Sequence, residues 1–205
     1  QFIELDSEPS IVRVPSIGDI LGDKLTAFAP NTTGIPYYKN GNSRGTEIMK
    51  QVYDIGRLFD AVDDLELTSK SFNRIALVEL GYRGLESDPL VIYEDIRQTA
   101  LLLATRGLDG KGDFPLLQDG IKRLGNFIYE NKYFIEDAIV DSAKAAYVAT
   151  CIEKGQSEIM KFDISRLSAD MNIDRVLPIR LNKLKKTRPE AFFYWYLIDQ
   201  MLQNN

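Results

Sequence analysis

A succession of helix-forming segments constrains the fold of this chain more than any other feature. Apolar residues recur at helical spacing in segments at residues 16–29, 45–61, 68–81, 91–105, 114–130, 134–154, 164–170, 176–186 and 188–203. Glycine and proline stand in the breaks between them, for example between residues 30 and 36 and again at Gly155. Short connections between amphipathic helices are typical of antiparallel bundles, so the sequence predicts a mainly α fold, a helical bundle.

Two strand-like runs precede these helices, at residues 2–5 and 11–14, with a turn-like segment between them. A lone two-stranded hairpin is only marginally stable in water. We therefore expect residues 1–15 to be remnant strands of a sheet that begins upstream, and residues 16–205 to form a C-terminal helical domain.

Composition excludes several classes of function. The chain has 205 residues, a formal net charge of -5, one cysteine and no histidine. The lack of histidine excludes a catalytic histidine triad and histidine-ligated zinc within these residues. The single cysteine, Cys151, fits a reducing compartment, so we expect a cytoplasmic protein with a buried structural thiol. No apolar run approaches the roughly 20 residues of a membrane span, and we expect no membrane partner.

The first helix carries a lysine at a position where a core-facing helix normally has an apolar residue. Ser16 and Asp19 have the spacing of a capping box, which predicts the start of the helix. The apolar positions that follow share one face, and Lys24 falls near its centre. A lysine there must snorkel to water, pair with a carboxylate or point into a cleft.

The next helix has a polar row beside its apolar stripe, formed by Lys50, Asp54 and Arg57. One interpretation is an exposed row of ion pairs, each contributing a few tenths of a kcal/mol. The other is that Lys50 and Asp54 face the same cleft as Lys24. The long loop between the two helices carries hydroxyl and basic side chains that suit phosphate groups, but it lacks the Gly-Lys-Ser/Thr of a Walker loop.

The order of these two helices resembles a motif of the AbiEii/AbiGii toxin family of nucleotidyltransferases. Residues 17–28, with Lys24-Leu25-Thr26-Ala27, are similar to the first helical signature of that family, and residues 50–58, with Asp54, are similar to the second. One departure is that Gln51 stands where the family has the first aspartate of the second signature.

The resemblance implies a bacterial enzyme with a DNA-polymerase-β-like fold, and the predicted hairpin would then be left from its α/β sheet. Such an enzyme transfers a nucleotidyl group from an NTP to an acceptor such as tRNA, with Mg²⁺. The chain lacks the family's Gly-Gly turn and Asp-x-Asp strand, so the resemblance places the metal-binding half upstream. It implies Lys24 and Asp54 as catalytic residues and Lys24, Lys50, Thr32 and Thr33 as nucleotide-binding residues, with no metal ligand here.

Two other functions stay open. The last helix is apolar on every side, which favours core packing first and a partner surface second. The chain is a helical interaction module if Lys24 and Asp54 only pair with each other and this helix docks a partner such as an antitoxin protein. Alternatively, residues 175–188, which hold six basic residues and no acidic one, contact a nucleic-acid backbone or simply form a solvated helix end.

Overall fold

Helices make up most of the chain, which confirms the predicted mainly α class. The computed structural model describes residues 11–86, 88–128 and 132–203. Its α-helices are α1 (Ile17–Ala27), α2 (Gly45–Ala61), α3 (Glu66–Tyr82), α4 (Leu90–Ala104), α5 (Phe114–Leu124), α6 (Ile135–Glu153), α7 (Leu184–Thr187) and α8 (Pro189–Gln203). Two 3₁₀ turns, η1 (Ile164–Arg166) and η2 (Ile179–Lys183), lie in the connection between α6 and α7.

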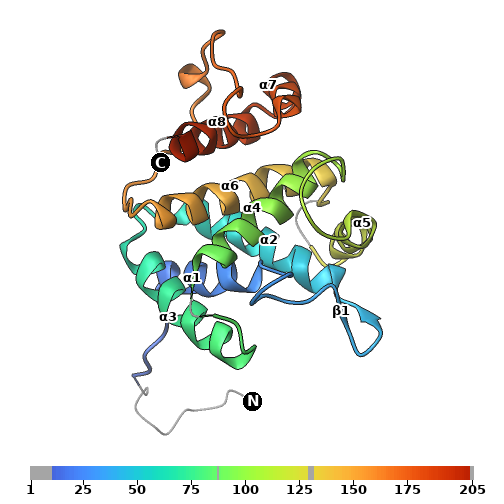
Figure 1. Cartoon of the computed structure of the whole chain (residues 1–205), viewed down its shortest axis with the longest axis vertical. Coiled ribbons are helices and arrows are strands. Elements are labelled where there is room, and N and C mark those ends of the chain that lie inside the picture. The colour runs from blue at the N-terminus through green and yellow to red at the C-terminus, as the bar shows by residue number, and fades with distance from the viewer. Residues whose placement is uncertain (1–10, 87, 129–131, 204–205) are drawn as a thin grey trace, which may run out of the picture.

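The helices are stacked in tiers with α6 near the centre (Figure 1). Helices α1 and α3 pack together at the bottom of this view, and α2 joins them to α6. Helix α4 lies along α6, while α8 covers the other side of α6 at the top. Because it is packed by α2, α4 and α8, α6 is buried along most of its length, and any polar side chain on it needs a partner within the protein.

Two glycines allow α1 and α2 to lie close to neighbouring helices. A Cβ atom on Gly22 of α1 would lie 2.7 Å from the backbone oxygen of Thr68 in α3. A Cβ atom on Gly56 of α2 would lie 2.1 Å from a carboxylate oxygen of Asp141 in α6. A larger residue at Gly22 would push α1 away from the backbone of α3, and one at Gly56 would displace the buried carboxylate of Asp141.

The only hairpin in the described residues lies between α1 and α2, not before α1. Strands β1 (Tyr38–Lys39) and β2 (Asn42–Ser43) pair around Asn40 and Gly41, whose φ values of 52° and 76° suit an Asn-Gly hairpin turn. The predicted strand at residues 11–14 is wrong, because these residues are exposed and have no ladder partner in the described part of the chain. The other predicted strand, residues 2–5, lies outside the described residues.

Three predicted helices are shorter than the apolar pattern indicated. Helix α5 ends at Leu124 instead of continuing to residue 130, because Gly125 follows and begins a turn. The segment 164–170 forms only the short turn η1. The segment 176–186 is divided, because Pro178 disfavours helix at the residue before it and regular structure starts at Ile179.

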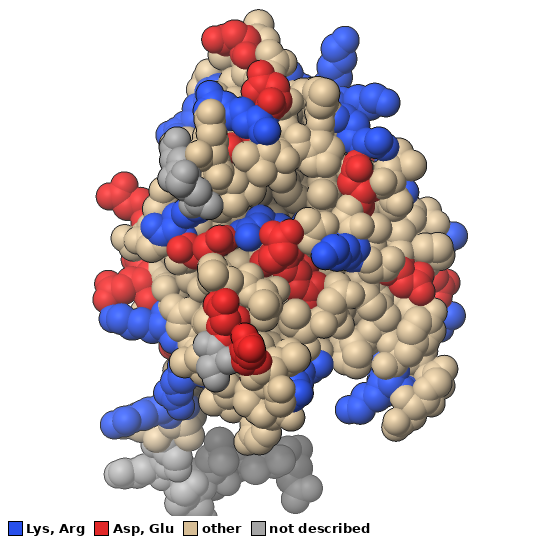
Figure 2. Space-filling model, viewed as in Figure 1, with Lys and Arg blue, Asp and Glu red and all other residues tan. Residues whose placement is uncertain are grey.

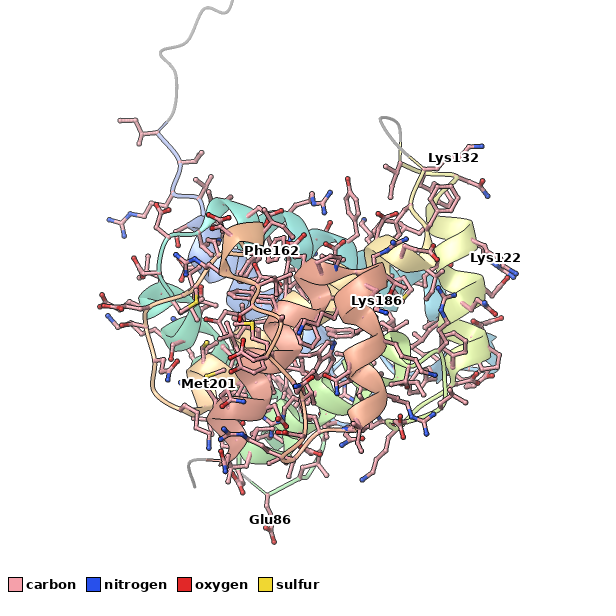
Figure 3. The ribbon with its side chains drawn as sticks, turned by 90° about the horizontal axis from the view of Figure 1, so that it is seen from above. Glu86, Lys122, Lys132, Phe162, Lys186 and Met201 are labelled. Carbon is pink, nitrogen blue, oxygen red and sulfur yellow. The ribbon has the colours of Figure 1, made fainter. Side chains whose placement is uncertain are left out.

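The C-terminal segment packs on α6 and lies nearest the viewer when the molecule is seen from above (Figure 3). Phe162, Lys186 and Met201 lie in this segment, whereas Lys122 and Lys132 lie at one side (Figure 3). Trp195 and its neighbours on α8 are buried in the core of the chain itself, so the prediction of core packing for this helix is confirmed and the alternative of a docking surface on it is not. Its apolar residues are satisfied by packing within the chain.

Candidate functional site

The structure brings Lys24 and Asp54 together at the seam between α1 and α2. The Lys24 Nζ atom lies 2.9 Å from the Asp54 Oδ2 atom. The predicted capping box is present, and α1 begins directly after Ser16. The backbone N–H of Ser16 donates to the Asp19 carboxylate, and the backbone N–H of Asp19 donates to the Ser16 hydroxyl, both at 3.1 Å. Residues on the opposite side of α1 pack against α3, which leaves Lys24 facing α2.

Partial exposure makes this ion pair accessible to a ligand. The side chains of Lys24 and Asp54 are 23% and 27% exposed, respectively. A pair this close to water contributes only about 0–1 kcal/mol to stability. Of the three possibilities open to Lys24, pairing with a carboxylate is the one that the structure shows, and the pair remains within reach of a phosphate.

A hollow of about 440 Å³ lies nearby, between α1, the loop that follows it, the start of α2 and the end of α3. Asp23 and Ala27 of α1 and Glu47 of α2 line it, but neither Lys24 nor Asp54 does. The hollow has basic groups, but those of Arg44 and Arg83 already bind protein atoms. Arg44 donates to Glu47 at 2.7 Å, and Arg83 donates to two backbone oxygens of the α1–β1 loop.

The two threonines of this loop point to different places. Thr33 lines the hollow, but its hydroxyl donates to the backbone oxygen of Thr26 at 3.2 Å. Thr32 lines a separate pocket, and its hydroxyl donates to the buried carboxylate of Asp95 at 2.8 Å. Asp95 also accepts two hydrogen bonds from Asn31. Both hydroxyls therefore hold the loop in place, and the two threonines line separate hollows that include neither Lys24 nor Asp54.

Lys50 lies exposed on α2, one turn before Asp54. Among the described residues, Asp54 forms its ion pair with Lys24 and not with Lys50. The predicted polar row also divides at its other end, since Arg57 turns away toward α6. The structure thus groups Lys24 with Asp54 but does not add Lys50, Thr32 or Thr33 to them.

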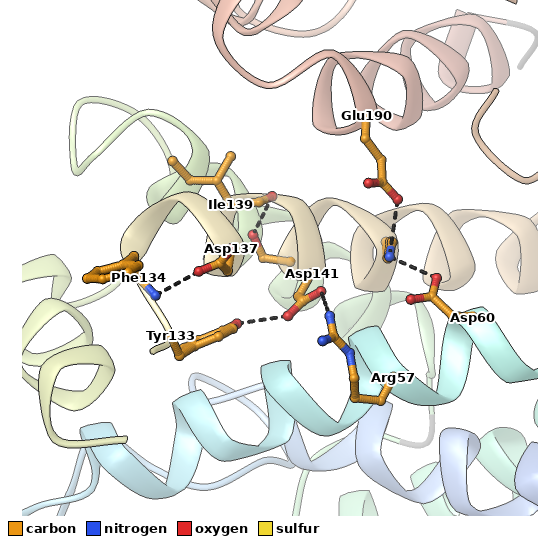
Figure 4. Close-up of polar contacts among 10 residues, drawn as sticks. Arg57, Asp60, Tyr133, Phe134, Asp137, Ile139, Asp141 and Glu190 are labelled. Atoms are coloured by element: carbon orange, nitrogen blue, oxygen red, sulfur yellow. Dashed lines mark hydrogen bonds and ion pairs between the residues drawn. The ribbon is translucent and has the colours of Figure 1, made fainter. Parts of the chain in front are cut away.

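A buried polar network on α6 is the feature that the sequence patterns did not reveal (Figure 4). Asp141 is 1% exposed, receives a hydrogen bond of 3.0 Å from the Tyr133 hydroxyl, and lies 3.2 Å from the Arg57 guanidinium. Burial raises the pKa of Asp141 to about 6, although the nearby charges of Arg57 and Lys144 oppose this rise.

One turn further along α6, Lys144 joins three helices. Its ammonium lies 2.8 Å from Asp60 of α2 and 3.1 Å from Glu190 of α8, and the side chain is almost fully buried. Asp141 and Lys144, in the middle of the alanine-rich segment 135–153, were a usable signal, because buried charges require partners. What the sequence could not supply was the identity of partners such as Asp60, 84 residues away.

The remaining site expectations concern metals, membranes and the thiol. Within the described residues, no group of three or more histidine, cysteine, aspartate or glutamate side chains could hold a metal ion. In the same part of the chain, no helix is both long and apolar enough to cross a membrane. Cys151 is buried as predicted, and burial raises the pKa of its thiol to about 11.

Comparison of the chain with protein-family models, curated proteins and solved structures gave no match.

Proposed function

We propose that this chain supplies part of a nucleotidyltransferase site, in which Lys24 and Asp54 act as a pair. The observation that carries the proposal is the 2.9 Å ion pair between them. The two residues come from the two helical signatures that resemble the AbiEii family, and 30 positions separate them in the sequence. Their contact at 2.9 Å is what a shared site requires.

In this proposal Lys24 binds the phosphates of the NTP. A lysine ammonium is a compact positive charge, suited to the negative charge that develops on a transferring phosphoryl group. Asp54 holds that ammonium at the seam and keeps it from rotating freely into solvent. Since the carboxylate is itself partly exposed, it can also accept a proton from an attacking hydroxyl that reaches the pair.

The described residues do not fit the Mg²⁺ ion that the resemblance implies, because no set of acidic side chains among them could bind it. We therefore assign no step to a metal in this chain. An NTP substrate, a tRNA or other nucleic-acid acceptor, and a cytoplasmic location belong to the same proposal.

A nucleotide-incorporation assay tests the proposal. The full-length product of the gene is incubated with total tRNA, Mg²⁺ and each radiolabelled NTP in turn. Lys24→Ala is expected to abolish incorporation. The free energy of unfolding, measured in urea, should change by no more than about 1 kcal/mol. Lys122→Ala, which removes an exposed lysine on α5, is the control that should keep full activity. Normal incorporation by Lys24→Ala would exclude the assigned role.

A partner-binding module is the second candidate, and a different surface now favours it. Leu67, Leu77, Val78 and Tyr82 of α3 are large apolar residues that are between 48% and 82% exposed. If an antitoxin protein covers this face, Val78→Asp should abolish its binding to the chain. That variant should leave nucleotide incorporation intact if the two functions are separate.

A further inference from the structure

A cleft of about 970 Å³ lies between the C-terminal segment and the end of α4. One wall is the connection that follows α4, together with the first turns of α6, and the other wall is formed by η2 and α7. This volume is at the upper end of the range for small-molecule sites, about 300–1,000 Å³. The cleft is lined by residues from the basic segment 175–188, so the structure gives that segment a concave surface.

Basic side chains outnumber acidic ones in this cleft. Arg180 lies 2.8 Å from Asp109, and Arg106 lies 2.9 Å from Glu136. Arg188 also faces Glu136, but at 4.0 Å. These contacts neutralise part of the basic charge.

Lys183 is the lining cation that remains available. It lies on the wall formed by η2, is exposed, and has no ion pair among the described residues. Four cations and two carboxylates therefore give the cleft two excess positive charges, in a chain whose net charge is -5. Figure 2 shows lysine and arginine side chains gathered at the upper right of the molecule, over α7.

The rest of the basic segment has other contacts. Lys185 donates to the backbone oxygens of Ala169 and Met171 and lies over the ring of Phe192, so it holds the C-terminal segment together. Arg180, Lys183 and Arg188, in contrast, line the cleft. This division separates a structural lysine from the cations that line the cleft.

Exposed apolar side chains also line the cleft. Leu108 and Ile179 on the walls are 70% and 72% exposed. Apolar groups beside guanidinium groups suit a ligand that combines a flat base or sugar with negative charge.

We propose that this cleft binds the phosphate groups of a nucleotide or of a nucleic-acid backbone. Arginine presents two parallel N–H donors that match phosphate oxygens, and an incoming phosphate can share the guanidinium groups that now face Asp109 and Glu136. The binding requires neither Lys24 nor the transfer reaction, so it stands apart from the function proposed above.

Fluorescence anisotropy with a labelled single-stranded RNA of about twelve nucleotides tests the proposal, without Mg²⁺ or NTP. Lys183→Glu is expected to weaken binding at least about tenfold. It should also reduce by about one the slope of the logarithm of the binding constant against the logarithm of the salt concentration. Lys186→Glu is the matched control, because Lys186 is exposed on the adjacent helix α7 and does not line the cleft. It carries the same change of charge and should weaken binding less than about threefold.

Competitors identify the source of the phosphate. Displacement of RNA by ATP at low concentration indicates a nucleotide site, whereas displacement only by unlabelled RNA indicates a backbone site. Polyglutamate that competes as well as RNA would overturn the proposal in favour of an acidic protein partner. Equal weakening by Lys183→Glu and Lys186→Glu, or no binding of either RNA or ATP, would also overturn it. Lys24→Ala should bind RNA normally, so failure of the transfer proposal is recognised separately.

Discussion

Replacing Asp141 by asparagine is predicted to stabilise the chain at neutral pH. Burial raises the pKa of Asp141 from 3.8 to about 6 in the folded protein. The folded state therefore holds this proton more tightly than the unfolded state does. The contribution of this group to stability is greatest below the unfolded pKa and is lost as the pH rises through about 6. The full loss is about 3 kcal/mol, because each pH unit that separates the folded and unfolded pKa values corresponds to about 1.4 kcal/mol.

The structure explains why asparagine is tolerated at this position. Its side-chain oxygen can still accept the hydrogen bond from Tyr133, and Arg57 is 55% exposed, so water can solvate the released guanidinium. The other charged groups that affect Asp141 are Lys144 and Asp60, which also bind each other. The substitution therefore leaves no new buried charge without a partner.

Urea unfolding of both proteins at about pH 5 and about pH 7.5 measures the effect. Between these two values, the stability of the wild type relative to Asp141→Asn should fall by a little over 1 kcal/mol, roughly half of the full loss. The other carboxylates titrate in both proteins, so their effect cancels in the difference between the two free energies of unfolding. A difference that stays constant with pH, or a wild type that is the more stable protein at pH 7.5, would refute the reasoning.

Two further substitutions test packing and loop anchoring by urea unfolding. Gly56→Ala should destabilise by about 1–3 kcal/mol because its Cβ meets Asp141, whereas Gly81→Ala in α3, with nothing within 4 Å, should be neutral or slightly stabilising. Equal effects would contradict the close packing of α2 on α6. Asp199→Ala should lower the free energy of unfolding by about 2–4 kcal/mol, because the buried carboxylate accepts hydrogen bonds from the backbone N–H groups of residues 174–177. The control Asp174→Ala should change it by less than about 0.5 kcal/mol. An unchanged Asp199→Ala would show that this loop does not need its anchor.

Local signals in the sequence predicted much of the helical framework. The bounds of α2 match the predicted segment, and the Ser16–Asp19 capping box is present, because helix caps and amphipathic periodicity depend on residues close in sequence. The same local pattern predicted a strand at residues 11–14, where strand pairing, which depends on distant residues, is absent from the described chain.

The candidate site was predicted only in part, for a similar reason. Lys24 was identified because a charged residue interrupts an apolar face, and Asp54 was identified by its place in a polar row. Arg57 stands in the same row, yet it faces Asp141, 84 residues further along the chain. The spacing on one helix does not indicate which neighbouring helix lies on each side, so the sequence could not separate Arg57 from the Lys24–Asp54 pair.

A comparison of single and double variants tests the central proposal, that Lys24 and Asp54 act as one unit in nucleotidyl transfer. Incorporation rates are measured for Lys24→Ala, Asp54→Asn and the double variant in the full-length protein. If the two residues act together, the double variant should be no slower than the slower single variant, because losses within a unit do not add. Losses that multiply, or rates equal to the wild type, would contradict the account.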